Sequence, residues 1–151
     1  MRILVQLVKE ASVRVDEKPI SSIGRGFLLF VGFTIGDNEE IASKMVDKVT
    51  KLRIFPDENG KTNLSLSDVK GEVLSVSQFT LYGSAKEGNR PSFVNAMKPD
   101  EARDLYAKFN EILKTKIPDL KTGIFQADMK VSLTNDGPFT LWLDSDELFK
   151  K

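Results

Sequence analysis

The chain has 151 residues, and its 22 Lys and Arg residues balance 22 Asp and Glu residues. This length suits one domain with a sizeable core, while zero net charge argues against a protein that coats nucleic acid through a broad basic surface. A local basic patch could still hold one end of an RNA. The chain contains no His and no Cys, so disulfides and the usual His/Cys zinc sites are excluded, and any chemistry must run without imidazole or thiolate.

The sequence lacks the features of a membrane or secreted protein. No apolar run approaches the roughly 18 residues of a transmembrane helix, and the N-terminus lacks the layout of a signal peptide. We therefore expect a cytoplasmic protein that makes no contact with a membrane.

The first part of the chain predicts strands. Residues 3–8 place apolar side chains on both faces, which is typical of a strand buried on both sides. Glu10-Ala11 predicts a turn into a second strand over residues 12–16, and residues 20–23 predict a brief third strand. The apolar run 27–33 is typical of a central strand.

The first predicted helix begins at Asp37, where Glu40 three residues later resembles a capping box. Apolar residues then follow at helical spacing, and we expect the helix to end near residues 53–55, before Pro56. The apolar stripe consists of Ile41, Met45, Val49 and Leu52, widened by Ala42 and Val46.

The middle of the chain predicts a strand over residues 72–82 and then a long loop over residues 83–98, with one turn of helix at 92–96. Loops of this length inside a compact domain are usually functional or disordered. A second helix begins at Pro99, a residue favoured at the first helical position. Its predicted buried stripe is Ala102, Leu105, Tyr106, Phe109, Ile112 and Leu113.

Three more strands are predicted near residues 121–125, 130–134 and 139–144, and we expect the last seven residues, which are polar, to be frayed. This order of elements predicts an α/β fold. We expect a single domain over residues 1–151, a layered sandwich of mixed, curved β-sheet with two helices on one face.

Two short blocks place polar residues in or beside apolar, strand-like runs, where packing does not explain their presence. The first is Ser77-Gln78-Phe79-Thr80-Leu81. In an extended strand, Ser77, Phe79 and Leu81 would share one face and Gln78 and Thr80 the other. An unpaired buried polar group costs about 1–3 kcal/mol, so these side chains need partners or lie near an edge. Thr80 is a weak nucleophile without a base to activate it, whereas main-chain N–H groups here could bind an oxyanion.

The second block is Asn135-Asp136-Gly137-Pro138-Phe139-Thr140. A plain β-turn between two strands accounts for its first four residues. The alternative is a rigid Gly137-Pro138 unit with a cis bond, which presents main-chain groups with no side chain in the way. Such a unit could measure a small ligand by its shape.

Two further pairs of residues are candidate RNA contacts. Lys86 and Arg90 could hold phosphate or ribose, although an ordinary solvated loop is the simpler explanation. Phe125 and Met129 flank a predicted bend and could form a slot for a base, although core packing is the default for such side chains.

The two blocks, in this order, resemble the D-aminoacyl-tRNA deacylases. The resemblance covers nearly the whole chain. Further segments that match in order and spacing are Ala11-Ser12-Val13, Leu52-Arg53-Ile54-Phe55, Asn63-Leu64-Ser65, Gly88 with Arg90-Pro91-Ser92-Phe93, Ala127-Asp128-Met129 and Val131-Ser132-Leu133.

The resemblance implies a homodimeric hydrolase with active sites at the subunit interface. We expect no metal site and no cofactor, and the sequence leaves any need for a divalent ion open. Its substrate would be the ester that joins a D-amino acid to the 3′-terminal adenosine of tRNA. The L-aminoacyl ester would be spared, and glycyl-tRNA stays open as a further substrate. The ribose 2′-OH beside the ester could help to activate water, which fits a chain without His or Cys.

The resemblance also implies roles for residues of this chain. Ser77, Gln78, Phe79 and Thr80 would form the catalytic pocket and present main-chain groups to the scissile carbonyl. We favour Thr80 as a positioning residue, with a nucleophilic role as the alternative. A cis Gly137-Pro138 unit would reach into the other subunit's site and leave no room for an L side chain. Phe125 and Met129 would hold the adenosine, and Lys86 and Arg90 are our candidates for further contacts with tRNA.

Two residues depart from the family pattern. Leu7 follows Gln6 where the family usually has Arg, which bears on the strictness of chiral selection, and Gln126 stands where a small residue is usual. Two other functions therefore stay open: an editing hydrolase with relaxed stereochemistry, and a non-catalytic module that binds RNA ends or nucleotides.

Overall fold

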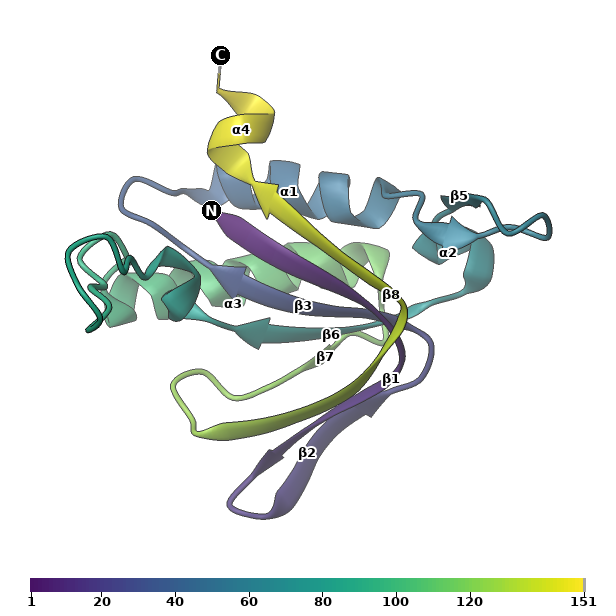
Figure 1. Cartoon of the computed structure of the whole chain (residues 1–151), viewed down its shortest axis with the longest axis horizontal. Coiled ribbons are helices and arrows are strands. Elements are labelled where there is room, and N and C mark those ends of the chain that lie inside the picture. Colours follow the sequence, from purple (N-terminus) through teal and green to yellow (C-terminus); the bar gives the residue numbers. More distant parts are fainter. Residues whose placement is uncertain (151) are drawn as a thin grey trace.

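The computed structural model describes residues 1–150, which form a mixed sheet with helices packed against it (Figure 1). The strands are β1 (Arg2–Val15), β2 (Lys18–Ile23), β3 (Gly26–Gly32), β4 (Phe55–Pro56), β5 (Thr62–Leu64), β6 (Glu72–Ser77), β7 (Lys121–Thr122) and β8 (Met129–Asp144). The helices are α1 (Glu39–Lys51), α2 (Leu66–Val69), the 3₁₀ helix η1 (Phe79–Tyr82), α3 (Pro99–Lys116) and α4 (Ser145–Phe149).

The main sheet has the order β2-β1-β3-β6-β7, and β8 pairs with β1. The pairs of β1 with β2, β3 and β8 are antiparallel, whereas the pairs of β3 with β6 and of β6 with β7 are parallel. In Figure 1, β1 and β8 bend together and carry β2 away from the helices. The curled sheet nearly closes, because the Ser21 hydroxyl on β2 donates a hydrogen bond to the Thr122 carbonyl on β7.

The long strand β1 differs from the sequence-based prediction. The expected turn at Glu10-Ala11 is wrong, because Ala11 pairs with Ile23 of β2 and with Leu133 of β8 in one continuous strand. The first half of β1 pairs with β3 and the second half with β2, while β8 follows its other edge throughout. Neighbours on both edges hold the strand extended where the local sequence suggests a turn.

Helices α1 and α3 cover one face of the sheet, as predicted (Figure 1). Their apolar stripes pack on alternate residues of β3, among them Phe27, whose ring stacks on Phe55 at 5.1 Å between centroids. Leu28 points to the opposite face and joins a second buried cluster inside the curl. Burial on both faces explains why β3 reads as a continuous apolar run.

Helix α1 begins one residue later than the predicted capping box requires. Asn38 is its N-cap, and the Asn38 side chain accepts a hydrogen bond from the Ile41 amide at 3.0 Å. Asp37 instead accepts from the Thr34 amide at 2.8 Å and pairs with the α-ammonium of Met1 at 2.8 Å. The carboxylate therefore ties the start of β1 to the loop before α1.

The end of the chain is ordered, so the predicted fraying is wrong for residues 145–149. They form α4, whose first residue Ser145 is buried and accepts a hydrogen bond from the Met1 ammonium at 2.8 Å. The Ser145 amide also donates to the Met1 carbonyl. These long-range bonds hold a polar segment that has no apolar pattern of its own; Lys151 lies outside the described residues. Over residues 1–150, no helix has both the length and the apolar character needed to cross a membrane.

Candidate active site

Strand β6 ends at Ser77, and the chain then turns into the short helix η1. The Gln78 amide donates to the Val31 carbonyl at 2.7 Å as the last link to β3, and Gln78 itself departs from strand geometry with φ −150° and ψ 82°. The predicted strand to Tyr82 is therefore wrong beyond Ser77, and the expected alternation of faces does not apply. Gly32 permits the turn, because a β-carbon there would lie 2.8 Å from the Gln78 carbonyl oxygen.

The polar side chains of the first block pair with each other at the surface. Gln78 Nε2 donates a hydrogen bond to Thr80 Oγ1 at 2.5 Å, and Thr80 is exposed. Gln78 gives η1 no side-chain cap, and the first N–H groups of a helix have no acceptor within it. The amides at Phe79 and Thr80 are therefore available to an acceptor from outside the helix.

A cavity of about 700 Å³ opens where β6 ends. Ser77, Gln78 and Phe79 line it from one side, Phe125 lines it from the segment before β8, and Met129 lines it as the first residue of β8. Phe79 is 55% exposed and meets Phe93 edge to face at 5.2 Å between ring centroids. The structure thus brings together five residues that the sequence singles out separately, while Thr80 lies beside this group through its bond to Gln78.

Phe125 is held from behind by a buried tyrosine. The two rings lie 6.0 Å apart, and the Tyr106 hydroxyl donates to the Ser75 carbonyl at 2.9 Å and accepts from the Ser75 hydroxyl. Burial raises the pKa of Tyr106, so the hydroxyl stays a neutral donor. This anchor fixes one wall of the cavity from the core.

The rim of the same wall carries an arginine that sequence reasoning missed. Arg103 lies 5.6 Å from the centroid of Phe125, and its Nη2 donates to Gln126 Oε1 at 2.8 Å. Gln126 takes a left-handed backbone conformation with φ +66°. The departure from the family pattern at Gln126 thus adds a polar link across the rim, which no local pattern around Arg103 predicts.

Lys86 and Arg90 do not line the cavity. Both are exposed in the loop between η1 and α3, which two backbone hydrogen bonds between Ser84 and Ser92, each 2.8 Å long, close at its base. The predicted turn of helix at residues 92–96 is only a hydrogen-bonded turn, with the Ala96 amide donating to the Phe93 carbonyl. Lys98, at the end of this loop, does line the cavity.

The second block does not form a plain turn between two strands. β8 runs through it, with Asn135 paired to Val8 and Thr140 paired to Gln6. The four residues 136–139 therefore stand opposite Leu7 alone and bulge from the strand; this segment is called the 136–139 bulge below. Its Gly137–Pro138 peptide bond is cis, as the family resemblance implies, and Gly137 has φ +125°.

A hydrogen-bonded network closes the base of the 136–139 bulge. Asn135 Nδ2 donates to Gln6 Oε1 at 2.8 Å and to Thr140 Oγ1 at 2.9 Å, and Asn135 Oδ1 accepts from the Phe139 amide. Thr140 Oγ1 also donates to Gln6 Oε1 at 2.5 Å. Leu7 is buried in the main core. Gln6, missed as a functional residue, thus holds the bulge without help from the side chain at position 7.

We predict that Asn135→Ala loosens the 136–139 bulge while the fold persists. The change removes the acceptor of the Phe139 amide and one of the two donors to Gln6 Oε1. We therefore expect a loss of about 1–3 kcal/mol in the free energy of unfolding. Amide hydrogen exchange at Phe139 should accelerate by a larger factor than the loss in global stability alone would produce. Ser132→Ala, an exposed hydroxyl on the same strand, is the control. Unchanged protection at Phe139 in Asn135→Ala would contradict the network.

Gly137 and Pro138 are both exposed, and neither lines the cavity of their own chain. Within the described chain, the cavity is thus lined by residues of the first block and by none of the second.

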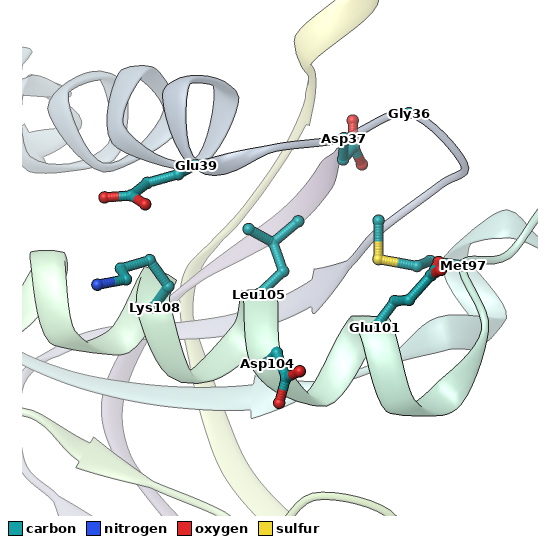
Figure 2. Close-up of a pocket in the computed structure, with 8 residues that line it drawn as sticks. All are labelled: Gly36, Asp37, Glu39, Met97, Glu101, Asp104, Leu105 and Lys108. Carbon is teal, nitrogen blue, oxygen red and sulfur yellow. The ribbon is translucent and has the colours of Figure 1, made fainter.

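A second hollow, of about 470 Å³, lies between the start of α1 and the face of α3. Figure 2 shows Leu105 and Met97 pointing into it, while Asp37 lies on the loop above. It contains no residue of either block, and its Asp37 carboxylate is already paired with Met1. We therefore assign the candidate active site to the larger cavity at the end of β6.

The family follows from comparison with known proteins. The model of the D-Tyr-tRNA(Tyr) deacylase family matches residues 4–144, and the chain belongs to this family. The D-aminoacyl-tRNA deacylase of Lactobacillus acidophilus is 55% identical over 144 residues, which cover 95% of this chain and 99% of the relative. That of Thermotoga petrophila is 53% identical over 149 residues, covering 99% and 100%.

Two solved structures are similar to this chain over nearly its whole length. The chain is similar to the c-Myc DNA unwinding element binding protein, with a TM-score of 0.90, 40% identity and coverage of 95% of this chain and 98% of that one. A probable eukaryotic D-amino acid tRNA deacylase has a TM-score of 0.83 over 94% of this chain and 97% of that one. At 18% identity, this second likeness shows the fold alone.

Proposed function

We propose that this chain hydrolyses the ester bond of D-aminoacyl-tRNA, releasing the free D-amino acid and tRNA. The observation that carries the proposal is the cavity at the end of β6, where Ser77, Gln78 and Phe79 of the first block face Phe125 and Met129. Relatives named D-aminoacyl-tRNA deacylase, more than half identical over nearly the whole chain, support the same activity. The enzyme would thereby proofread the chirality of amino acids before translation, and it would act in the cytoplasm, where tRNA is charged.

The terminal adenosine would occupy the slot between Phe125 and Met129. Phe125 offers an aromatic face for stacking, and such base stacking contributes about 1–3 kcal/mol. The ester carbonyl would then lie near the start of η1, where the Phe79 and Thr80 amides lack acceptors within the helix. Donors directed at a developing oxyanion are a large source of rate acceleration.

Proton transfer need not come from a protein side chain. The ribose 2′-OH lies next to the ester on the substrate and could assist the attacking water or the leaving oxygen, with the protein supplying position. Thr80 would act as a positioning residue, because its hydroxyl accepts from Gln78 Nε2 and the chain has no His that could activate it as a nucleophile.

Chiral selection would come from a second copy of the chain. The exposed 136–139 bulge presents main-chain atoms of Gly137, which carry no side chain and so define a rigid limit to the space beside the α-carbon. Leu133 and Trp142, 36% and 42% exposed, lie on the same strand and give β8 an apolar surface for a homodimer. Glycyl-tRNA, which lacks a side chain, would pass this filter as well.

The exposed loop cations would extend the contact along the RNA. Lys86 and Arg90 project from the surface beyond the cavity, where they could bind backbone phosphates of the acceptor end. Such contacts position the RNA and weaken with salt without reading its sequence.

The proposed function is tested by the release of D-tyrosine from D-tyrosyl-tRNA, measured beside L-tyrosyl-tRNA under identical conditions. We expect rapid release of the D-amino acid and no release of the L-amino acid. Release of both would indicate an editing hydrolase with relaxed stereochemistry and implicate Leu7. Release of neither, with tRNA still bound, would indicate a binding module and would contradict the proposal.

We predict that Thr80→Ala slows turnover by about 10- to 100-fold without abolishing it, because a positioning hydroxyl is lost while the main-chain donors and the 2′-OH remain. Single-turnover release of D-tyrosine measures this. Thr115→Ala, which removes an exposed hydroxyl bonded only within α3, serves as the control. Complete loss of activity, together with a covalent adduct trapped on the wild-type Thr80, would show that Thr80 is the nucleophile.

A further inference from the structure

The guanidinium of Arg2 makes four contacts, two with the end of η1 and two with the end of β8. Its Nη1 donates a hydrogen bond to the Leu81 carbonyl at 2.8 Å, and its Nε pairs with Asp144 at 3.0 Å. The guanidinium carbon lies 4.4 Å from the centroid of the Tyr82 ring and 5.3 Å from that of Trp142. Leu81 and Tyr82 are the last two residues of η1, whereas Asp144 and Trp142 belong to the end of β8. Arg2 thus joins three segments that are distant in the sequence.

The contacts match the chemistry of arginine rather than that of a generic cation. The planar guanidinium donates in two directions at once while its face lies on aromatic rings, which a lysine ammonium cannot do. Burial raises the pKa of Tyr82, and the nearby carboxylates of Asp37 and Asp144 raise it further, so the ring stays neutral beside the cation. The Asp144 carboxylate is itself held by the Asp146 amide at 2.9 Å. The Asp144 partner of the arginine is therefore fixed in place.

Within residues 1–150, one hydrogen bond at each end anchors η1. At its start, the Gln78 amide binds the Val31 carbonyl. At its end, the Leu81 carbonyl points out of the helix, and Arg2 is the group that binds it. A helix of four residues has little stability of its own, so its position depends on the buried Tyr82 side chain and on these two anchors. Phe79 and Thr80 lie between them.

We propose that Arg2 is a positioning residue for the deacylation site, which clamps the end of η1 and so sets the place of Phe79 and Thr80. Arg2 does not line the cavity, so it acts on the reaction only through η1. The proposal rests on the proposed function. It predicts an effect on the chemical step, because η1 would face the ester. The adenosine slot between Phe125 and Met129, which line the cavity from other segments, should be unaffected.

The test compares Arg2→Lys and Arg2→Met with the wild type in steady-state hydrolysis of D-tyrosyl-tRNA. A displacement of about 1 Å at a reacting centre can cost on the order of 100-fold in rate. We expect kcat to fall about 10-fold in Arg2→Lys, which keeps the ion pair with Asp144, and about 100-fold in Arg2→Met, which keeps only the packing. KM should stay within about twofold in both. Arg25→Lys, which disturbs an arginine stacked on Phe55 at the far end of β3, is the matched control and should leave kcat unchanged.

A second measurement tests the contact between Arg2 and η1 independently of enzymatic activity. Trp142 is the only tryptophan of the chain, so its fluorescence should change when the guanidinium is removed. Amide exchange at Leu81 and Gly83, whose amides donate within and just after η1, should accelerate in both variants while the amides of α3 stay protected. A purely structural role would instead lower protection throughout the chain.

The outcomes separate the two proposals. Accelerated exchange in η1 with a lowered kcat at constant KM supports the positioning role. A wild-type kcat in folded Arg2→Met, or unchanged exchange at Leu81 and Gly83, would overturn it. If the wild type itself releases no D-tyrosine, the proposed function fails, whereas the exchange data still decide whether Arg2 clamps η1.

Discussion

Gly137→Ala is expected to lower kcat/KM for D-tyrosyl-tRNA by at least about 100-fold while the protein stays folded. Gly137 has φ +125°, a conformation that L residues rarely adopt, and forcing such a conformation costs about 1–3 kcal/mol. An alanine would relieve this cost by reshaping the exposed 136–139 bulge. A shift of about 1 Å there is enough to remove its fit to a substrate in the partner's site.

Gly60→Ala provides the matched control for this prediction. Gly60 also has a positive φ, +76°, and has no neighbour within 4 Å of its would-be β-carbon. It lies in the turn after β4, where its amide donates to the Asp57 carbonyl, and it belongs to neither of the two blocks. We expect the two variants to lose similar amounts in the free energy of unfolding, measured with urea, and only Gly137→Ala to lose activity. Wild-type rates and chiral selectivity in Gly137→Ala would contradict the role of the bulge.

The two long helices, α1 and α3, and the central strand β3 were predictable because their patterns are local. The stripe through Phe109 and Leu113 repeats at helical spacing, and both side chains are buried in α3. The apolar run of β3 likewise reports burial on two faces. Strand β1 was not predictable as one element, since Glu10 and Ala11 favour a turn locally and only the partners on both edges keep them extended.

The same distinction applies to the site. Polar residues within an apolar run mark the block from Ser77 to Thr80, but the turn into η1 depends on the close approach of Gly32, more than forty residues earlier. The base of the 136–139 bulge is closed by Gln6, 129 positions away from Asn135. The link between Arg103 and Gln126 is a further case. A side-chain bond across such a span leaves no periodic trace in the sequence, so the residues that hold the site emerge only from the fold.

The largest expected effect on stability is that of Gly26→Ala. Gly26 lies between β1 and β6, paired with Val8 on one side and Glu72 on the other. A β-carbon at Gly26 would come within 1.8 Å of the Glu72 carbonyl oxygen and 2.6 Å of its carbonyl carbon. Both atoms belong to the main chain, so no change of rotamer can relieve the overlap and β6 must move. We expect the free energy of unfolding to fall by about 3 kcal/mol or more, at the upper end of the cost of overpacking.

Because β6 leads directly into η1, a folded fraction of Gly26→Ala should also lose most of its activity. Gly24→Ala separates this effect from the general cost of replacing glycine. A β-carbon at Gly24 would meet only the Glu72 carboxylate, at 3.1 Å, and that side chain can rotate away, so we expect a change below about 1 kcal/mol. Urea denaturation of the two variants measures the difference. If Gly26→Ala is as stable as Gly24→Ala, then β3 and β6 do not approach as closely as described, and the anchoring of the site at the end of β6 would have to be revised.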